Sequence, residues 1–362
     1  MPEKLKRIGT QPCLEPGSSC ISLRKTLKQV YQNLIMLTRR TALSLPLGLA
    51  AIAPAFAEGA PIALALNSAA GSISIIDMTT RQVLRTEPTY REPSHWALTP
   101  DRQQLLVCDA SGNAVFAFDP TTAAPLGHRR IADPYQIGFS PDQKYFIANA
   151  LRLNFVDVYD AASFALVKRF KLGLWPSHLD FSPDSRWSFH SMQNSDTLVS
   201  LDLTTMTERW SVKVGSTPAG VLWHKGKVLV CIMGARGFVE VDPVDGRITR
   251  RVVTGDGAHN LFYDATRHIL YVSNRGPGKT GLTALNPDSY DIIRTYPIPG
   301  GPDDIGIDPE GNIWICLRYA ENVAVLNPTT GAYSTIPVGR SPHGIFLSTT
   351  LRHKGRITAE TV

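Results

Sequence analysis

The sequence predicts an all-β fold: a seven-bladed β-propeller of four-stranded antiparallel blades. Three observations lead to this prediction: a short phrase that recurs seven times, a nearly constant spacing between its copies, and four strand-like runs in each interval. Intervals of about 40–45 residues are typical of propeller blades, each of which is a four-stranded sheet. The repeat therefore favours one closed domain over most of the 362 residues.

The recurring phrase, here called the anchor, is clearest at residues 175–184, which read Trp-Pro-Ser-His-Leu-Asp-Phe-Ser-Pro-Asp. Its seven copies begin at Pro93, Pro134, Pro176, Pro218, Gly257, Pro302 and Pro342. The spacings between successive copies are 41, 42, 42, 39, 45 and 40 residues. This regularity predicts one blade per interval.

Within the interval that begins at Pro176, four runs have strand character: residues 178–182, 187–191, 197–201 and 208–214. An Asp or Asn recurs in the turn after the third run of an interval, at Asp77, Asp119, Asp160, Asp202, Asp242 and Asn327. Such side chains bond nearby backbone N–H groups. We therefore assign these residues to hairpin turns and not to catalysis.

The two ends of the repeat region complement each other. Residues 62–67, 72–77 and 82–86 read as three strands with no anchor before them, whereas residues 342–347 read as an anchor strand that only a tail follows. We expect the N-terminal strands to pair with the C-terminal innermost strand and close the ring, which removes open sheet edges. The predicted organisation is a leader (1–57), a propeller (58–350) and a tail (351–362).

The positive charge of the chain belongs to the leader. Eight of the 37 Lys and Arg residues and two of the 31 acids lie there, which leaves 29 of each in the rest of the chain. The sequence therefore makes no strong case for nucleic-acid binding, which needs a basic surface.

The leader has the pattern of an export signal. Arg39 and Arg40 precede an apolar run that is too short to cross a membrane, and Ala55-Phe56-Ala57 resembles a cleavage site. The arginine pair resembles a twin-arginine signal, although Ala42 stands where that pattern usually has Phe. We expect a periplasmic or secreted monomer with no membrane span in the mature chain, and Met36 is an alternative start.

Cys13 and Cys20 lie in the leader, and three cysteines remain. Cys108, Cys231 and Cys316 occupy the same place in three intervals. An odd count without Cys-x-x-Cys favours buried apolar side chains over disulfides or metal ligands.

The anchor pattern, together with the run Leu270-Tyr271-Val272-Ser273-Asn274, resembles the YVTN-repeat β-propellers over about residues 60–350. These are similar to periplasmic YncE-like and cytochrome d1-domain-like propellers, although Tyr-Val-x-Asn occurs cleanly only once. This resemblance implies a haem-like cofactor or a redox partner. Residues 308–314, with Pro342-His343-Gly344-Ile345, also resemble virginiamycin B lyase-type propellers over about 45 residues.

In a propeller the innermost strands begin around one mouth of the central channel. The third anchor position there reads His95, Gln136, His178, Gly220, His259, Asp304 and Gly344, and Asp303 and His343 stand one residue earlier. Neutral imidazoles can bind a metal or act as a general base. We name His95, His178 and His259 as candidate ligands of a divalent metal and His343 as a candidate catalytic residue. The alternative is that these histidines only satisfy backbone carbonyls of neighbouring blades.

Four arginines follow the second strand of their intervals and should lie above the same mouth: Arg152, Arg236, Arg275 and Arg318. Arginine binds carboxylate or phosphate as a planar fork. With Tyr135, Trp175 and Tyr319 nearby, we predict a small anionic, partly aromatic ligand. The alternative is that the arginines form salt bridges with Asp133, Asp157, Glu240 or Glu321.

Three functions stay open. The first is an exported binding module whose ligand or protein partner is seated at the mouth, with His95, Gln136, His178, His259, Asp304 and the four arginines as contacts. The second is a metal-assisted lyase or lactonase that uses the histidines with Asp303 and Asp304. The third is the cofactor role that the resemblance implies. The sequence contains no Gly-x-Ser-x-Gly, His-Glu-x-x-His or Cys-x-x-Cys-His motif, so nucleophilic catalysis has no support.

Overall fold

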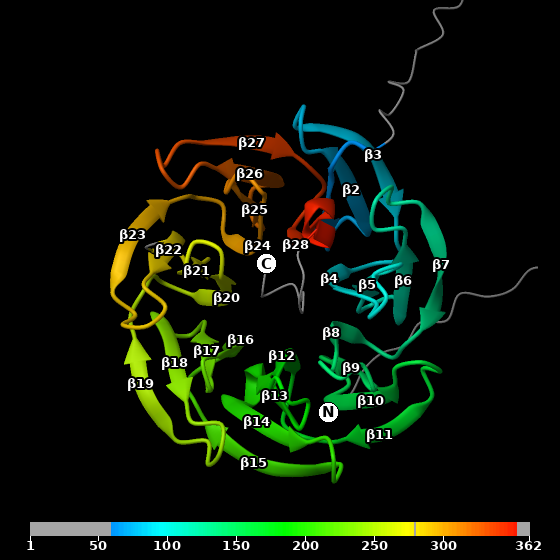
Figure 1. The fold of residues 1–362 in the computed structure, drawn as a ribbon, viewed down its shortest axis with the longest axis vertical. Helices are drawn as coiled ribbons and strands as arrows, with labels where there is room; N and C mark the ends of the chain where they lie inside the picture. Colours follow the sequence, from blue (N-terminus) through cyan, green and yellow to red (C-terminus); the bar gives the residue numbers. More distant parts are fainter. Residues whose placement is uncertain (1–58, 279, 353–362) are drawn as a thin grey trace, which may run out of the picture. The chain divides into compact units, whose positions relative to one another are not determined.

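The computed structural model describes residues 59–278 and 280–352, and these residues form a seven-bladed β-propeller. The predicted leader, Cys13, Cys20 and residues 353–362 lie outside the described residues. Each blade is a four-stranded antiparallel sheet, and Figure 1 shows the seven sheets arranged as a ring. The predicted fold class is therefore confirmed.

Strands of the same rank occupy the same place in every blade. The innermost strands are β28 (Pro342–Leu347), β4 (Pro93–Leu98), β8 (Pro134–Phe139), β12 (Pro176–Phe181), β16 (Pro218–His224), β20 (Ala258–Asp264) and β24 (Pro302–Ile307). The second strands are β1 (Ile62–Asn67), β5 (Leu105–Asp109), β9 (Tyr145–Ala150), β13 (Trp187–Met192), β17 (Lys227–Ile232), β21 (Ile269–Asn274) and β25 (Ile313–Leu317).

The third strands are β2 (Ser72–Asp77), β6 (Ala114–Phe118), β10 (Phe155–Asp160), β14 (Thr197–Asp202), β18 (Gly237–Val241), β22 (Gly281–Leu285) and β26 (Asn322–Leu326). The outer strands are β3 (Gln82–Pro88), β7 (Pro125–Arg130), β11 (Leu166–Phe170), β15 (Thr207–Lys213), β19 (Ile248–Val252), β23 (Ile292–Pro297) and β27 (Tyr333–Pro337). Two short 3-10 helices, η1 (Gln193–Ser195) and η2 (Ser348–Arg352), complete the described elements. Among the residues that the structure describes, no helix has the length and apolarity that a membrane span requires.

The ring closes in blade 1, where β28 pairs with β1 and the sheet order is β28-β1-β2-β3. Blades 2 to 7 follow in chain order, from β4–β7 to β24–β27. The N-terminal strands thus pair with the C-terminal innermost strand, as predicted. Trp96 of blade 2 donates its indole N–H to the carbonyl of Ile345 in β28 at 2.8 Å, which ties the closing strand to its neighbour.

The apolar core lies between blades. Seven buried clusters each join two neighbouring blades, so every interface of the ring has its own core. Cys108, Cys231 and Cys316 are free, fully buried and part of three of these clusters. Their predicted role as small apolar side chains is confirmed.

The recurrent turn residues also take their predicted place. Oδ1 of Asp77 accepts hydrogen bonds from the backbone N–H groups of Thr79 and Thr80, at 2.7 and 2.8 Å. Asn327 binds the equivalent N–H groups of Thr329 and Thr330. These carboxylates and amides close hairpins at the periphery and leave the centre of the ring to other residues.

Candidate functional site

The innermost strands share a distortion at their first residues. In blades 2 to 7 the pairing register with the second strand shifts within two or three residues of the strand start, for example between Pro93 and Trp96 in β4. In blade 1, Asn67 and Ala65 of β1 face Pro342 and Ile345, so the extra residue again lies at the start of the innermost strand, β28. A bulge turns side chains away from their regular alternation. The anchors are therefore the bulged starts of strands and not turns that precede them.

Four imidazoles converge at these bulges. They come from blades 2, 4, 6 and 1, and their ring centroids are 5.1 Å apart for His95 and His178, 5.1 Å for His178 and His259, 6.1 Å for His259 and His343, and 4.6 Å for His343 and His95. All four side chains are buried. Tyr135 of blade 3 packs its ring against His95, His178 and His343. The histidines predicted around the mouth thus form one continuous cluster.

The bulge lets different anchor positions reach this cluster in different blades. The third position supplies His95, His178 and His259, whereas the second position supplies the other members, Tyr135, Asp303 and His343. In blades 3 and 7, where the second anchor residue enters the cluster, the side chain of the third anchor residue bonds the neighbouring blade instead. Oε1 of Gln136 accepts from the N–H of Leu179 at 2.6 Å, and Oδ2 of Asp304 accepts from the N–H of Ile345 at 3.2 Å. These two hydrogen bonds join neighbouring blades. That Gln136 or Asp304 contacts a ligand stays a prediction.

Gly220 and Gly344 fill the third position in the two remaining cases because neighbouring strands approach closely there. A Cβ on Gly220 would lie 2.1 Å from Oδ1 of Asn260, and a Cβ on Gly344 would lie 2.4 Å from the carbonyl oxygen of Ser94. Any other residue would push the innermost strands apart.

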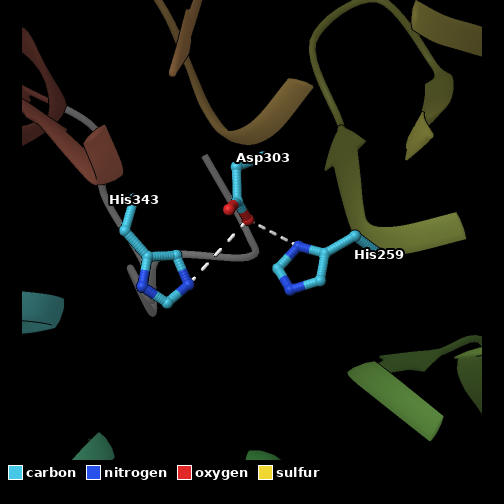
Figure 2. Close-up of side chains that lie close together, drawn as sticks. All are labelled: His259, Asp303 and His343. Atoms are coloured by element: carbon cyan, nitrogen blue, oxygen red, sulfur yellow. Dashed lines mark ion pairs between the residues drawn. The ribbon is translucent and has the colours of Figure 1, made fainter. Parts of the chain in front are cut away.

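Asp303 is the charged centre of the cluster and is fully buried. Its Oδ2 accepts hydrogen bonds from Nη1 of Arg275 at 2.7 Å and Nη1 of Arg318 at 3.2 Å. Its Oδ1 lies 2.6 Å from Nδ1 of His259 and 3.9 Å from Nε2 of His343. Figure 2 shows the carboxylate between the two imidazoles. The two oxygens therefore have separate partners: arginines on one side and imidazoles on the other.

His259, Asp303 and His343 form a group that could hold a metal. One candidate ligand atom from each residue lies within 4.8 Å of the other two. Of the ligands predicted from the sequence, His259 belongs to this group, while His95 and His178 contact it through ring edges. The sequence placed Asp303 and His343 with the histidines at one mouth, as candidates for a metal-assisted reaction, but it did not single out His259, Asp303 and His343 as one set of metal ligands. Which anchor positions face the cluster depends on strand geometry, which leaves no pattern in the sequence.

Burial sets the protonation of the cluster. It lowers the pKa of His95 to about 3 and that of His259 to about 4, and it holds the pKa values of His178 and His343 well below the ordinary range. The imidazoles are therefore neutral at pH 7. Burial alone would raise the pKa of Asp303, but Arg275 and the neighbouring imidazoles hold it well below its usual value. Burial keeps the pKa of Asp304 well above its usual value. Asp303 and its two arginine partners together carry a formal charge of +1.

The four predicted arginines divide into two pairs. Arg275 and Arg318 reach the cluster, with 14% and 20% of their side chains exposed. Arg152 instead binds Glu92 and Asp133, at 2.6 and 3.3 Å, and Arg236 binds Asp256 at 2.7 Å. Arg152 thus forms the salt bridge with Asp133 that the alternative predicted. Arg275 and Arg318 instead share the buried Asp303, a partner that the sequence did not suggest for them.

A surface cavity of about 570 Å³ adjoins Arg275. Its lining includes Met233, Tyr319 and the glycines Gly257, Gly276, Gly300 and Gly301. A Cβ on any of these glycines would lie closer than 3.0 Å to another protein atom, so the glycines let neighbouring loops pack closely around the cavity. Tyr319 is two-thirds exposed beside it. Of the predicted aromatic residues, Tyr135 joins the buried cluster, whereas Trp175 and Tyr319 are exposed.

The fold and the site define a closed β-propeller that gathers polar side chains of its innermost strands at the centre of the ring. The chain belongs to the YNCE-like β-propeller family, whose model matches residues 34–356, and the resemblance inferred from the anchors is confirmed. A search of curated proteins finds no match.

Solved structures show the same fold. A functionally unknown protein from Desulfotomaculum acetoxidans is 10% identical, with a TM-score of 0.67 over 79% of this chain and 98% of its own. The periplasmic gluconolactonase PpgL of Pseudomonas aeruginosa is 17% identical, with a TM-score of 0.63 over 79% and 99%. The dihydro-heme d1 dehydrogenase NirN is 13% identical, with a TM-score of 0.62 over 82% and 77%. At these identities the likeness establishes the fold alone.

The buried histidines predict a pH-dependent stability. His190 of β13 is also buried, between Asn149 and Ser188, and burial lowers its pKa to about 3. An unfolded histidine titrates near pH 6.5, so below that value the unfolded chain binds protons that the folded chain does not. Each such histidine should cost up to about 1.4 kcal/mol of stability per pH unit as the pH falls from 6.5 towards 4.

Urea unfolding between pH 7.5 and 4.5 measures this slope. The variant His190→Gln removes one titrating group. Its free energy of unfolding should therefore change less steeply with pH, by about 1.4 kcal/mol per pH unit. Equal slopes for the two proteins would contradict the assignment of a neutral, buried His190.

Proposed function

We propose that this protein is a binding module that holds a small anionic ligand at the centre of its ring, against Arg275 and Arg318. The observation that carries this proposal is the convergence of both guanidinium groups on one buried carboxylate, Asp303. Each uses Nη1 for this bond, and a guanidinium has five N–H donors in all. The carboxylate of Asp303 thereby holds two guanidinium groups in place at the edge of the buried cluster.

The charge and the shape of the site support an anion. Asp303 and its two arginine partners carry a formal charge of +1, and the imidazoles are neutral, so they can share hydrogen bonds with a ligand without adding charge. The cavity beside Arg275 is large enough for a sugar acid or a similar small molecule, and Tyr319 offers an aromatic wall. A haem-like cofactor, which the family resemblance implies, carries carboxylates and belongs to the same ligand class.

Calorimetric titration of metal-free protein with inorganic phosphate, gluconate and haemin tests this proposal. Loss of one charge-assisted hydrogen-bonding group costs about 1.5–3 kcal/mol, so Arg275→Ala and Arg318→Ala should each weaken binding about 10- to 100-fold. The control is Arg340→Ala, which removes an exposed arginine bonded to the carbonyl of Ala69, outside the cluster. Failure of all three probes to bind, or equal affinities in both cluster variants and the wild type, would overturn the proposal.

A metal-assisted lyase or lactonase is the second candidate function. It is favoured by the position of the His259, Asp303 and His343 group directly beside the arginine pair. In lactone hydrolysis, water adds to the carbonyl carbon, the ring C–O bond breaks, and a proton passes from the water to the leaving oxygen. Zinc-loaded protein would then hydrolyse gluconolactone above the spontaneous rate, and His343→Ala would not. A zinc-loaded protein without this activity would leave the binding module as the function.

We further propose that the protein is exported to the periplasm or secreted. The support is the arginine pair, the short apolar run and the Ala-Phe-Ala sequence of the leader. Expression with a native export machinery, followed by N-terminal sequencing, should give a mature chain that begins near Glu58. A chain that keeps Arg39 and Arg40 would contradict export by cleavage of this leader.

A further inference from the structure

We infer that His259, Asp303 and His343 form a binding site for a divalent transition metal. The site lies on the imidazole side of Asp303, opposite the two arginines, so its existence does not depend on the proposed anion binding. Three separate blades supply the donors: β20, β24 and the closing strand β28.

The spacing of the donor atoms suits one ion. Oδ1 of Asp303 lies 2.6 Å from Nδ1 of His259 and 3.9 Å from Nε2 of His343, and the ligand atoms of the group all lie within 4.8 Å of one another. Donors at about 2.0–2.1 Å from a tetrahedral metal are about 3.4 Å apart. The observed distances lie on both sides of this value, so small side-chain rotations bring the three donors onto one ion.

Several buried polar atoms of the site have no hydrogen-bond partner among the described residues. Nε2 of His259 and Nδ1 of His343 have none, whereas Nδ1 of His259 and Oδ1 of Asp303 form an ion-pair contact at 2.6 Å. Nε2 of His178 also has no hydrogen-bond partner. Of the eleven buried side-chain atoms without a hydrogen bond of regular geometry in the described part of the chain, five belong to this cluster, including the two atoms of the His259–Asp303 contact. Because buried polar groups are normally paired, the concentration points to a ligand that they hold.

The arginines prepare the carboxylate for this role. Nη1 of Arg275 and Nη1 of Arg318 both bind Oδ2, which fixes the plane of the carboxylate and turns Oδ1 towards the imidazoles. Outer contacts of this kind orient metal ligands in known sites. The two positive charges also reduce the affinity for a cation, and an anion on the open side of the metal would offset that repulsion.

The donor set selects the class of metal. Two imidazole nitrogens and one carboxylate oxygen suit Zn²⁺, Co²⁺, Ni²⁺ or Fe²⁺. Mg²⁺ and Ca²⁺ prefer shells made only of oxygen. With three protein donors, at least one coordination position stays open, as in catalytic zinc sites.

Titration of metal-free, full-length protein with CoCl₂ and ZnCl₂ in phosphate-free buffer tests the inference. We expect one equivalent of metal per chain, a visible Co²⁺ spectrum, and loss of that spectrum when Zn²⁺ is added. His259→Gln and His343→Gln remove one donor each and should weaken binding by more than the 10- to 100-fold typical of a lost outer contact. The control is His268→Ala, which removes an exposed histidine 2.7 Å from Asp288 and should leave the affinity unchanged.

A second measurement does not depend on the folding of the variants. X-ray absorption at the zinc edge of the loaded wild-type protein should show two imidazole ligands. A wild-type protein that binds neither metal, binding that persists in both glutamine variants, or a zinc ion without imidazole ligands would overturn the inference.

Discussion

The pairing of β28 with β1 is the constraint on which the rest of the structure depends. It turns a linear repeat into a ring, because the innermost strand of blade 1 comes from the far end of the described chain. It also completes two blade interfaces: Phe346 packs in the core towards blade 2, and Ile345 packs in the core towards blade 7. A chain without this pairing would expose both apolar faces and two strand edges at once.

The same pairing builds the site. His343 is the second residue of β28, so it meets His95 and Asp303 only when the ring is closed. Asp303 in turn depends on its surroundings, because a buried carboxylate without partners would be too costly to keep ionised. Arg275 and Arg318 supply the compensating charge, and they come from loops of blades 6 and 7. Fold closure and site chemistry are therefore coupled through His343, which joins Asp303 only when β28 closes the ring.

The bulged starts of the innermost strands give the ring its chemical variety. A regular strand would present the same anchor position in every blade. The shifted register instead lets His95 and His178 enter the cluster from the third position, and Tyr135 and Asp303 from the second. Seven similar repeats can thus place acid, base, phenol and imidazole groups in one small volume, while Gln136 and Asp304 join neighbouring blades.

The sequence by itself determined the architecture, since the spacing of the anchors, the hairpin residues such as Asp77 and the complementary ends of the repeat are local patterns. It also indicated the histidines and arginines around the mouth, because residues at the same position of each repeat lie at the same height in a propeller. Only the tertiary structure decided which of these residues meet. The bulges let either the second or the third anchor position face the cluster, and the packing of the blades set the distances, so Asp303 became the common partner of His259, Arg275 and Arg318. Such contacts depend on ångström-scale geometry across blades, which no spacing along the chain records.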